Sequence, residues 1–415
     1  MQLANVDTLI GHIHVARWLE RCSTFLRDLA SVEAESPFEP VRMMYRGLDV
    51  QTYPDRTTTH WHAFKVWLPT GGMQNVSLEF RIYDRPLKEA SNQWPIEVIY
   101  RSAPLWTVPF GELWHETLRT LTTLADEPVP AEDILTRVSR VDIAIDTDEL
   151  QFEEKDRDRL VTRAKHQSQY IDTYAWDDEE TESVDENEET LDQAMYHQGD
   201  RFTGFTFVKG KILCRIYNKW WEIARSASYK QDKRFFAELW QKAGWDLTKD
   251  VWRIEFQLRR EALHEFQVLE SNLRFAKLSI PEVLANAPSL LTYLMQDWIS
   301  LRTPTGSANR AKWPMDPAWQ KLVDTIQMSY GVSERHPLEP QLNPYQLAKV
   351  IKGYLTAFAV AVGESSSQGL MAKLPRLLAR YLEIAPQDLE HTLDAEITRK
   401  ALLQGVQTLE EVACS

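Results

Sequence analysis

The stretch Ser139-Arg-Val-Asp-Ile-Ala-Ile-Asp-Thr147 decides the fold, because apolar and polar residues alternate strictly along it. Valine or isoleucine occupies positions 141, 143 and 145. Alternation with a period of two is typical of a β-strand that buries one face. The spacing also predicts that Asp142 and Asp146 lie on the other face, with only Ala144 between them.

Two later stretches, Ile212–Lys219 and Val251–Arg260, show the same alternation and are also predicted to be strands. Their polar faces carry Arg215, Tyr217 and Lys219 in the first stretch, and Arg253, Glu255, Gln257 and Arg259 in the second. If the three strands share a sheet, carboxylates, a tyrosine and several cations meet on one surface. Such a surface suits phosphate chemistry.

The composition is that of a soluble globular protein with two or three domains, with 415 residues, 43% apolar and 26% charged. The net charge of −14 argues against an anionic partner. However, Asp177–Asp192 holds ten acidic residues and no basic one, so the rest of the chain carries −14 + 10 = −4. A block of like charge is typical of a disordered loop, so the total charge says little about the field of the folded part.

Cysteine usage and hydropathy favour a cytoplasmic protein without a membrane partner. Cys22, Cys214 and Cys414 are far apart, without the spacing of metal ligands, and are expected to be reduced thiols. The N-terminal residues lack the pattern of a signal peptide. The longest apolar stretch, Ala357–Val362, is far too short to span a bilayer.

The order of predicted elements indicates an α+β protein with an antiparallel sheet and flanking helices. Short alternating segments between Met43 and Tyr100, and a hairpin of Thr203–Val208 with Ile212–Lys219, are the remaining strands. Apolar residues at helical spacing predict helices over Asn5–Leu29, Phe110–Leu124, Glu153–Gln169 and Glu222–Ala243.

Strand signals cease at Ala262, and the remainder is predicted to be helical. We therefore expect a first domain over 1–268, with 177–192 as a disordered insert, and an all-helical domain over 269–415. Helices are expected from Asn343-Pro344, over Leu374–Ile384 and over Leu389–Leu403. Basic residues in this region favour DNA recognition or dimerisation as its role.

Two sets of side chains are candidate metal ligands. Asp142 and Asp146 are about 13 Å apart by strand rise, so one of them with Glu255 makes a better oxygen site for Mg²⁺ or Mn²⁺. In the simpler alternative, these acids form a ladder of ion pairs with the neighbouring arginines Arg140, Arg215 and Arg253. A second ligand set is His60-Trp61-His62, which resembles the HUH motif of endonucleases.

Tyr217 is the candidate nucleophile. A tyrosine that attacks phosphorus must lose its proton, which costs about 4 kcal/mol at pH 7 for a pKa of about 10. Arg215 and Lys219 on the same face would lower that cost and stabilise charge on phosphorus. The alternative is an ordinary packing role, which most strand tyrosines have.

The motifs Ser139-Arg-Val-Asp-Ile-Ala-Ile-Asp146, Arg215-Ile-Tyr-Asn-Lys219 and Trp252–Arg260 resemble, in that order, the Rep-trans family of rolling-circle replication initiators and relaxase-like nickases. The resemblance covers roughly 43–266. It implies an HUH-like, replication-initiator core that nicks one DNA strand with a tyrosine, remains joined to the 5′ phosphate and requires a divalent metal. The implied partners are single-stranded or origin DNA, a host helicase or polymerase, and a second copy of the chain.

By position, the resemblance makes Tyr217 the catalytic tyrosine, assisted by Lys219 and Arg215. It makes Asp142, Asp146 and Glu255 the metal ligands, and Lys219, Arg215 and Arg253 phosphate contacts. Further candidate nucleic-acid contacts are Arg259, Lys209 and Lys211. The chain departs from the family pattern in its long acidic insert and in the strand that precedes the tyrosine motif, Gly204–Gly210. Tyr174, Tyr196 and Tyr229 are rival nucleophiles.

Two other classes of function fit the same sequence. One is a catalytically silent DNA-binding regulatory protein that keeps the fold. The other is a protein-interaction scaffold, which the acidic composition would suit.

Overall fold

The computed structural model describes residues 1–36, 39–52, 61–68, 76–84, 94–130, 133–162, 193–198, 201–209, 211–225, 233, 235–268, 273–336, 344–382 and 384–404. The chain divides into two compact units, Met1–His336 and Pro337–Ser415, which are described separately. The predicted insert over 177–192 and the candidate ligand His60 lie outside the described residues.

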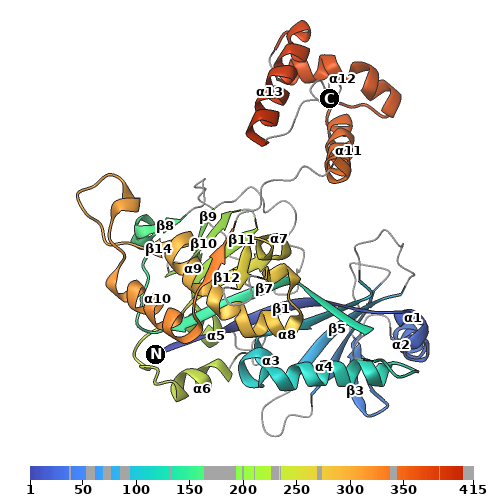
Figure 1. The fold of residues 1–415 in the computed structure, drawn as a ribbon, viewed down its shortest axis with the longest axis vertical. Helices are drawn as coiled ribbons and strands as arrows, with labels where there is room; N and C mark the ends of the chain where they lie inside the picture. The colour runs from blue at the N-terminus through green and yellow to red at the C-terminus, as the bar shows by residue number, and fades with distance from the viewer. Residues whose placement is uncertain are drawn as a thin grey trace. The chain divides into compact units, whose positions relative to one another are not determined.

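The first unit is built on a sheet of eleven described strands in which every neighbouring pair is antiparallel (Figure 1). In spatial order the strands are β2 (Arg42–Tyr45), β3 (Leu48–Thr52), β4 (Trp61–Trp67), β5 (Ser77–Tyr83), β6 (Ile96–Tyr100), β1 (Gln2–Val15), β7 (Ile134–Thr147), β12 (Trp252–Arg259), β11 (Ile212–Asn218), β10 (Arg201–Lys209) and β9 (Gln193–Gln198). The α+β class, the large antiparallel sheet and the three motif strands are confirmed.

Helices of the first unit are mostly short. They are α1 (Trp18–Arg21), α2 (Ser23–Glu35), α3 (Ser102–Thr107), α4 (Phe110–Leu124), α5 (Lys219–Arg225), α6 (Phe235–Lys242), α7 (Arg260–Leu263), α8 (Ile280–Asn286), α9 (Leu290–Tyr293) and α10 (Pro317–Tyr330). The helix predicted over Phe110–Leu124 is α4, with the same bounds. The helix predicted over Glu222–Ala243 is instead two helices, α5 and α6.

The prediction of one helix over Asn5–Leu29 is wrong for its first half. Residues 2–15 form β1, and helical structure begins only at Trp18. Leu9 and Ile13 fit both a strand and a helix, since residues four apart share a face in either. Tertiary pairing decides, because β1 is hydrogen-bonded to β6 on one side and to β7 on the other.

The helix predicted over Glu153–Gln169 is also wrong over its described part. Only Glu154–Arg159 is helical, as a 3₁₀ segment, and Leu160–Thr162 is a strand, β8, that pairs with β14 (Ile299–Leu301). Strands also continue beyond Ala262, since β13 (Phe266–Val268) pairs with β15 (Ser333–Arg335). Three-residue strands are too short to show a period in the sequence.

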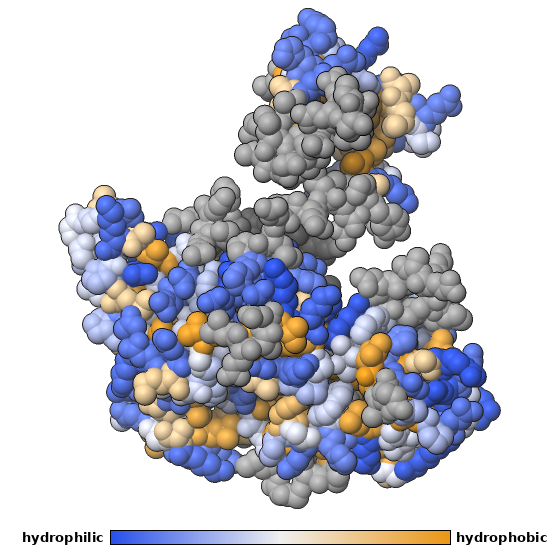
Figure 2. All heavy atoms as spheres, viewed as in Figure 1, coloured by the Kyte–Doolittle hydropathy of each residue, from blue (hydrophilic) through white to orange (hydrophobic). Residues whose placement is uncertain are grey.

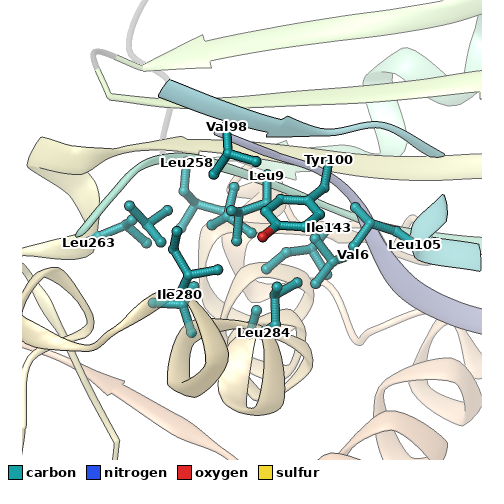
Figure 3. Close-up of a cluster of buried hydrophobic side chains, with 14 of the residues drawn as sticks. Val6, Leu9, Val98, Tyr100, Leu105, Ile143, Leu258, Leu263, Ile280 and Leu284 are labelled. Carbon is teal, nitrogen blue, oxygen red and sulfur yellow. The ribbon is translucent and has the colours of Figure 1, made fainter. Parts of the chain in front are cut away.

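One face of the sheet carries the core. Aliphatic side chains of β1, β6, β7 and β12 pack against α8, and Figure 3 shows Ile280 and Leu284 reaching toward Leu9, Val98 and Leu258. The helix approaches closely at Gly11, where an added Cβ would lie 2.4 Å from Ile280 Cδ1. Helices after residue 269 therefore belong to the same core as the sheet. The compact unit ends at His336, and not at the boundary of 268 that strand signals alone suggested.

The second unit is helical in its described part. Its elements are α11 (Pro344–Ala361), α12 (Ser367–Tyr381), a 3₁₀ turn over Pro386–Asp388 and α13 (Leu389–Gln404). The Ser366 side chain caps the start of α12 by accepting from the Gly369 N–H.

In the view of Figure 2, hydrophilic side chains cover most of the coloured surface and hydrophobic ones are scattered among them. No helix in the described ranges is long and apolar enough to cross a membrane.

Candidate functional site

The register of the sheet brings the three motif strands together on one polar face. Tyr217 of β11 lies opposite Arg253 of β12, which lies opposite Asp146 of β7. The next pair on the same face is Arg215 with Glu255, two residues along each strand. The shared face that alternation predicted is therefore present, on the side of the sheet opposite α8. Its Tyr217 end is covered by α3 and α6, which place Trp106, Phe236 and Trp240 against Arg253 and Asp146.

Tyr217 is held at its hydroxyl by an acid and a cation. Its O–H donates to Glu255 Oε2 at 3.0 Å, and Lys219 Nζ donates to the same phenol oxygen at 3.3 Å. Glu222 in turn lies 2.8 Å from Lys219 Nζ and 3.4 Å from Lys233 Nζ. The phenol therefore lies between a proton acceptor and a donor that can stabilise negative charge.

Burial governs the protonation of this group. Tyr217 is 5% exposed, and this burial raises the pKa of its phenol well above 10, with the nearby Glu255 charge adding to the effect. Burial also raises the pKa of Glu255, as does the charge of Asp7. The same desolvation lowers the pKa of Lys233 to about 8. In the resting state the phenol is neutral.

Gly204 gives Tyr217 its place in the sheet. The two residues are directly opposite across β10 and β11. A Cβ at position 204 would lie 2.4 Å from the Ile216 carbonyl oxygen and 2.9 Å from Tyr217 Cβ. Only glycine fits this close approach without a shift of the strands.

Arg253 forms a buried ion cluster with two acids. Its guanidinium donates to both oxygens of Asp146 at 2.6 and 2.9 Å, and to Asp7 Oδ1 at 2.6 Å. Trp240 Nε1 donates to Asp146 as well, at 2.9 Å. Arg253 and Asp146 are both 0% exposed. The arginine predicted to contact nucleic acid thus has its donors directed at carboxylates.

The predicted metal ligands do not converge in this arrangement. Asp142 binds Arg140 through both oxygens at 2.9 and 2.6 Å, Asp146 binds Arg253, and Glu255 accepts from Tyr217. Among the residues that the structure describes, no three acidic, histidine or cysteine side chains form a group able to hold a metal ion. The donor set does not fit a metal as placed here, and the ion-pair ladder is the arrangement observed.

The other predicted contacts are spread more widely. His62 shares the helix-covered face with Phe64 and lies 2.8 Å from Glu33 of α2, which raises the pKa of its imidazole. Lys211 and Arg259 are exposed, at the end of β11 and β12 away from Tyr217. The Lys209 side chain lies outside the described residues, as do Tyr174 and Tyr229.

Four residues near the polar face were not predicted from the sequence. Asp7 occupies an irregularity in the β1–β7 pairing, within a stretch that was predicted to be helical. Lys233 lies between two helices rather than inside one. His12 and His14 repeat the His-x-His spacing on β1, a signal visible in the sequence once that stretch is taken as a strand.

Comparison with known proteins gives little further identification. No protein family matches the chain, and no curated protein does. Among solved structures, a rolling circle replication initiator protein from Geobacillus stearothermophilus aligns with 81% of this chain and 100% of its own length, at 15% identity and a TM-score of 0.36. Overlap at this level assigns no role to any residue of this chain.

Proposed function

We propose that the protein is a tyrosine-dependent DNA strand transferase that nicks and rejoins single-stranded origin DNA to start rolling-circle replication. The single observation that supports this most is the position of the Tyr217 hydroxyl between Glu255 and Lys219. In the proposed step, the phenol oxygen bonds to phosphorus as its proton passes to Glu255. The bond from phosphorus to the 3′ oxygen breaks, and that oxygen leaves as a hydroxyl after taking up a proton from water.

Lys219 and Arg215 are proposed to offset the charge that develops on the phenol and phosphate oxygens. Because Tyr217 is buried, a DNA phosphate reaches it only after the covering side chains move aside. A divalent metal remains part of the prediction from the sequence, and no step above depends on one.

The test is a covalent adduct with labelled single-stranded oligonucleotides that survives denaturant. Tyr217→Phe is expected to abolish the adduct, and Glu255→Gln to slow its formation by roughly 10²–10⁴-fold as a lost general base. Tyr330→Phe, which alters a half-exposed tyrosine of α10, is the matched control and should react normally. Peptide mapping that finds the adduct on Tyr196, or on another tyrosine, would overturn the assignment. Parallel reactions with Mn²⁺ and with a chelator test the metal requirement.

A second candidate function is a silent DNA-binding protein of the same fold. The observation that favours it is the burial of Tyr217, which raises the pKa of the phenol and leaves little surface for attack. Salt-dependent DNA binding without any adduct, with Mn²⁺ present or absent, would support this alternative.

A further inference from the structure

The polar face of the sheet carries a second group of cations, several residues away from Tyr217. Arg259 at the end of β12 lies directly opposite Arg140 of β7, and Arg137 of β7 lies opposite His12 of β1. Arg260, the next residue after β12, donates instead to the carbonyl oxygens of Val138 and of Ala276, and Ala276 is buried in the core cluster on the other side of the sheet. We call the three arginines Arg137, Arg140 and Arg259 the basic end of the face.

Like charges directly opposite each other in an antiparallel pair are unfavourable, and only part of this charge is neutralised. Asp142 binds Arg140. Within the described ranges, no carboxylate forms an ion pair with Arg259 or Arg260, although Glu261 lies near enough to Arg260 to act on it electrostatically. Burial and neighbouring arginine charges lower the pKa of His12 to about 4 and lower the pKa of Arg137. Glu97 of β6 lies opposite His12 and 3.7 Å from its imidazole, and this carboxylate is also paired with Arg81.

Further cations extend the positive region beyond the sheet. Arg274 donates to the His264 carbonyl oxygen, and the charges of Arg260, Lys277 and Arg274 contribute, after burial, to a lowered pKa of His264. Arg335 and Lys211 differ from these, because both lie near Glu265. The excess positive charge thus belongs to the ends of β7 and β12 and to the turns beside them.

An aromatic ring accompanies the arginines. The Arg137 guanidinium lies 4.6 Å from the centre of the Trp94 ring, and His14 packs edge-on against the same tryptophan at 5.9 Å. Aromatic side chains beside a positive groove are the combination that binds unpaired bases and their phosphates. Guanidinium groups also match phosphate oxygens in a fork geometry.

We propose that the basic end of the polar face binds the phosphodiester backbone of a single nucleic-acid strand, with Trp94 as a stacking position. Glu255 and Arg259 are four residues apart on β12, a span of roughly 13 Å at strand rise. A strand held at Arg259, Arg140 and Arg137 therefore continues along β12 toward Tyr217. That continuation rests on the proposed function, whereas binding at the basic end does not.

The experiment measures fluorescence anisotropy of a labelled oligothymidine with the full chain over a series of salt concentrations. Arg259→Ala should weaken binding roughly fivefold and reduce the slope of log K against log salt by about 0.7, the value for one phosphate contact on a single strand. Arg27→Ala, an exposed arginine of α2 on the helix-covered side, is the charge-matched control and should change neither quantity. Trp94→Ala should weaken single-strand binding without changing the salt slope.

Equal affinity and slope for Arg259→Ala and Arg27→Ala would overturn the proposal, as would tighter binding of duplex than of oligothymidine together with no effect of Trp94→Ala. Circular dichroism melts show that each variant is folded. Adduct formation is measured separately, so a Tyr217→Phe protein that still binds oligothymidine separates this proposal from the strand-transfer reaction.

Discussion

Arg253 is the residue on which the buried charges beside Tyr217 depend most. Arg253 forms ion pairs with both Asp146 and Asp7, whose exposed fractions are 0% and 7%. Removing one partner of a buried ion pair leaves an uncompensated charge, which is far more costly than losing a surface pair.

We predict that Arg253→Met lowers the free energy of unfolding by about 3–5 kcal/mol at pH 7. The Arg253 charge, opposing burial, lowers the pKa of Asp7, so this contribution is present at neutral pH and is lost as the pH falls below the ordinary range of aspartate. The effect of the variant should therefore shrink in acid. Urea unfolding at pH 7 and at about pH 2.5, below the ordinary aspartate pKa, measures it. Arg215→Met, which removes a half-exposed cation 3.7 Å from Glu255, should cost less than about 1 kcal/mol, and equal losses for both variants would contradict the prediction.

His12 should make the protein less stable in mild acid. Its folded pKa of about 4 lies below the ordinary value of 6.5, so between these values the unfolded chain binds a proton that the folded chain excludes. From pH 7 to pH 5 this residue alone should lower the free energy of unfolding by about 2 kcal/mol. His12→Gln should lose that part of the pH dependence in urea titrations. Parallel pH curves for the two proteins would show that the imidazole is not excluded from protonation.

At the residue scale, the sequence predicts which side chains share a face of the sheet, but not which of them form ion pairs with each other. Alternation placed Tyr217, Glu255 and Arg253 on one side correctly, because a period of two leaves no other choice. It did not indicate which acid each arginine binds, since this depends on rotamers and on residues from distant segments. Asp7 is such a residue, and its contact with Arg253 spans 246 positions.

At the scale of elements, the pairing of β10 with β11 depends on Gly204. We predict that Gly204→Ala forces the strands apart at Tyr217, destabilising the protein by about 1–3 kcal/mol through overpacking, and slows adduct formation. Thermal melts and the adduct assay measure the two effects. Gly306→Ala, with open space around an added Cβ, is the control. Normal melting and normal reaction of Gly204→Ala would show that the close approach is not required.

Element prediction succeeded where one period was long and unambiguous, as in α4 and the motif strands. It failed for β1 because residues Leu9 and Ile13 satisfy both periods, and pairing with β6 and β7 settled the outcome. It failed for β13 to β15 because each has only three residues.

At the scale of the whole molecule, the helices that cover the apolar face of the sheet come from residues after 268, which the sequence analysis predicted to be a separate domain. Ile280, Leu284, Trp298 and Trp319 are all buried in the same cluster as the strands. A boundary cannot be located from a change in helix content alone, since α+β units mix both elements around one core.

We predict that a fragment of residues 1–336 folds, whereas a fragment of residues 1–268 does not. The shorter fragment exposes the apolar face of β1, β7 and β12 and loses the tryptophans above it, so it should aggregate or bind hydrophobic dyes. Circular dichroism and thermal melts distinguish the two, with a cooperative transition expected for the longer fragment. A cooperative melt of the shorter fragment would show that the core does not need α8 to α10.

The central position of β1 has a consequence for biosynthesis. Its two neighbours in the sheet, β6 and β7, begin at Ile96 and Ile134, so the strand leaves the ribosome long before either edge can be paired. The nascent chain therefore carries an unpaired β1 until β7 is complete at Thr147, and the apolar face of β1 stays uncovered until α8 follows at Ile280. Because the edges and the apolar face of β1 are exposed during synthesis, we expect the growing polypeptide to bind chaperones that recognise exposed strands.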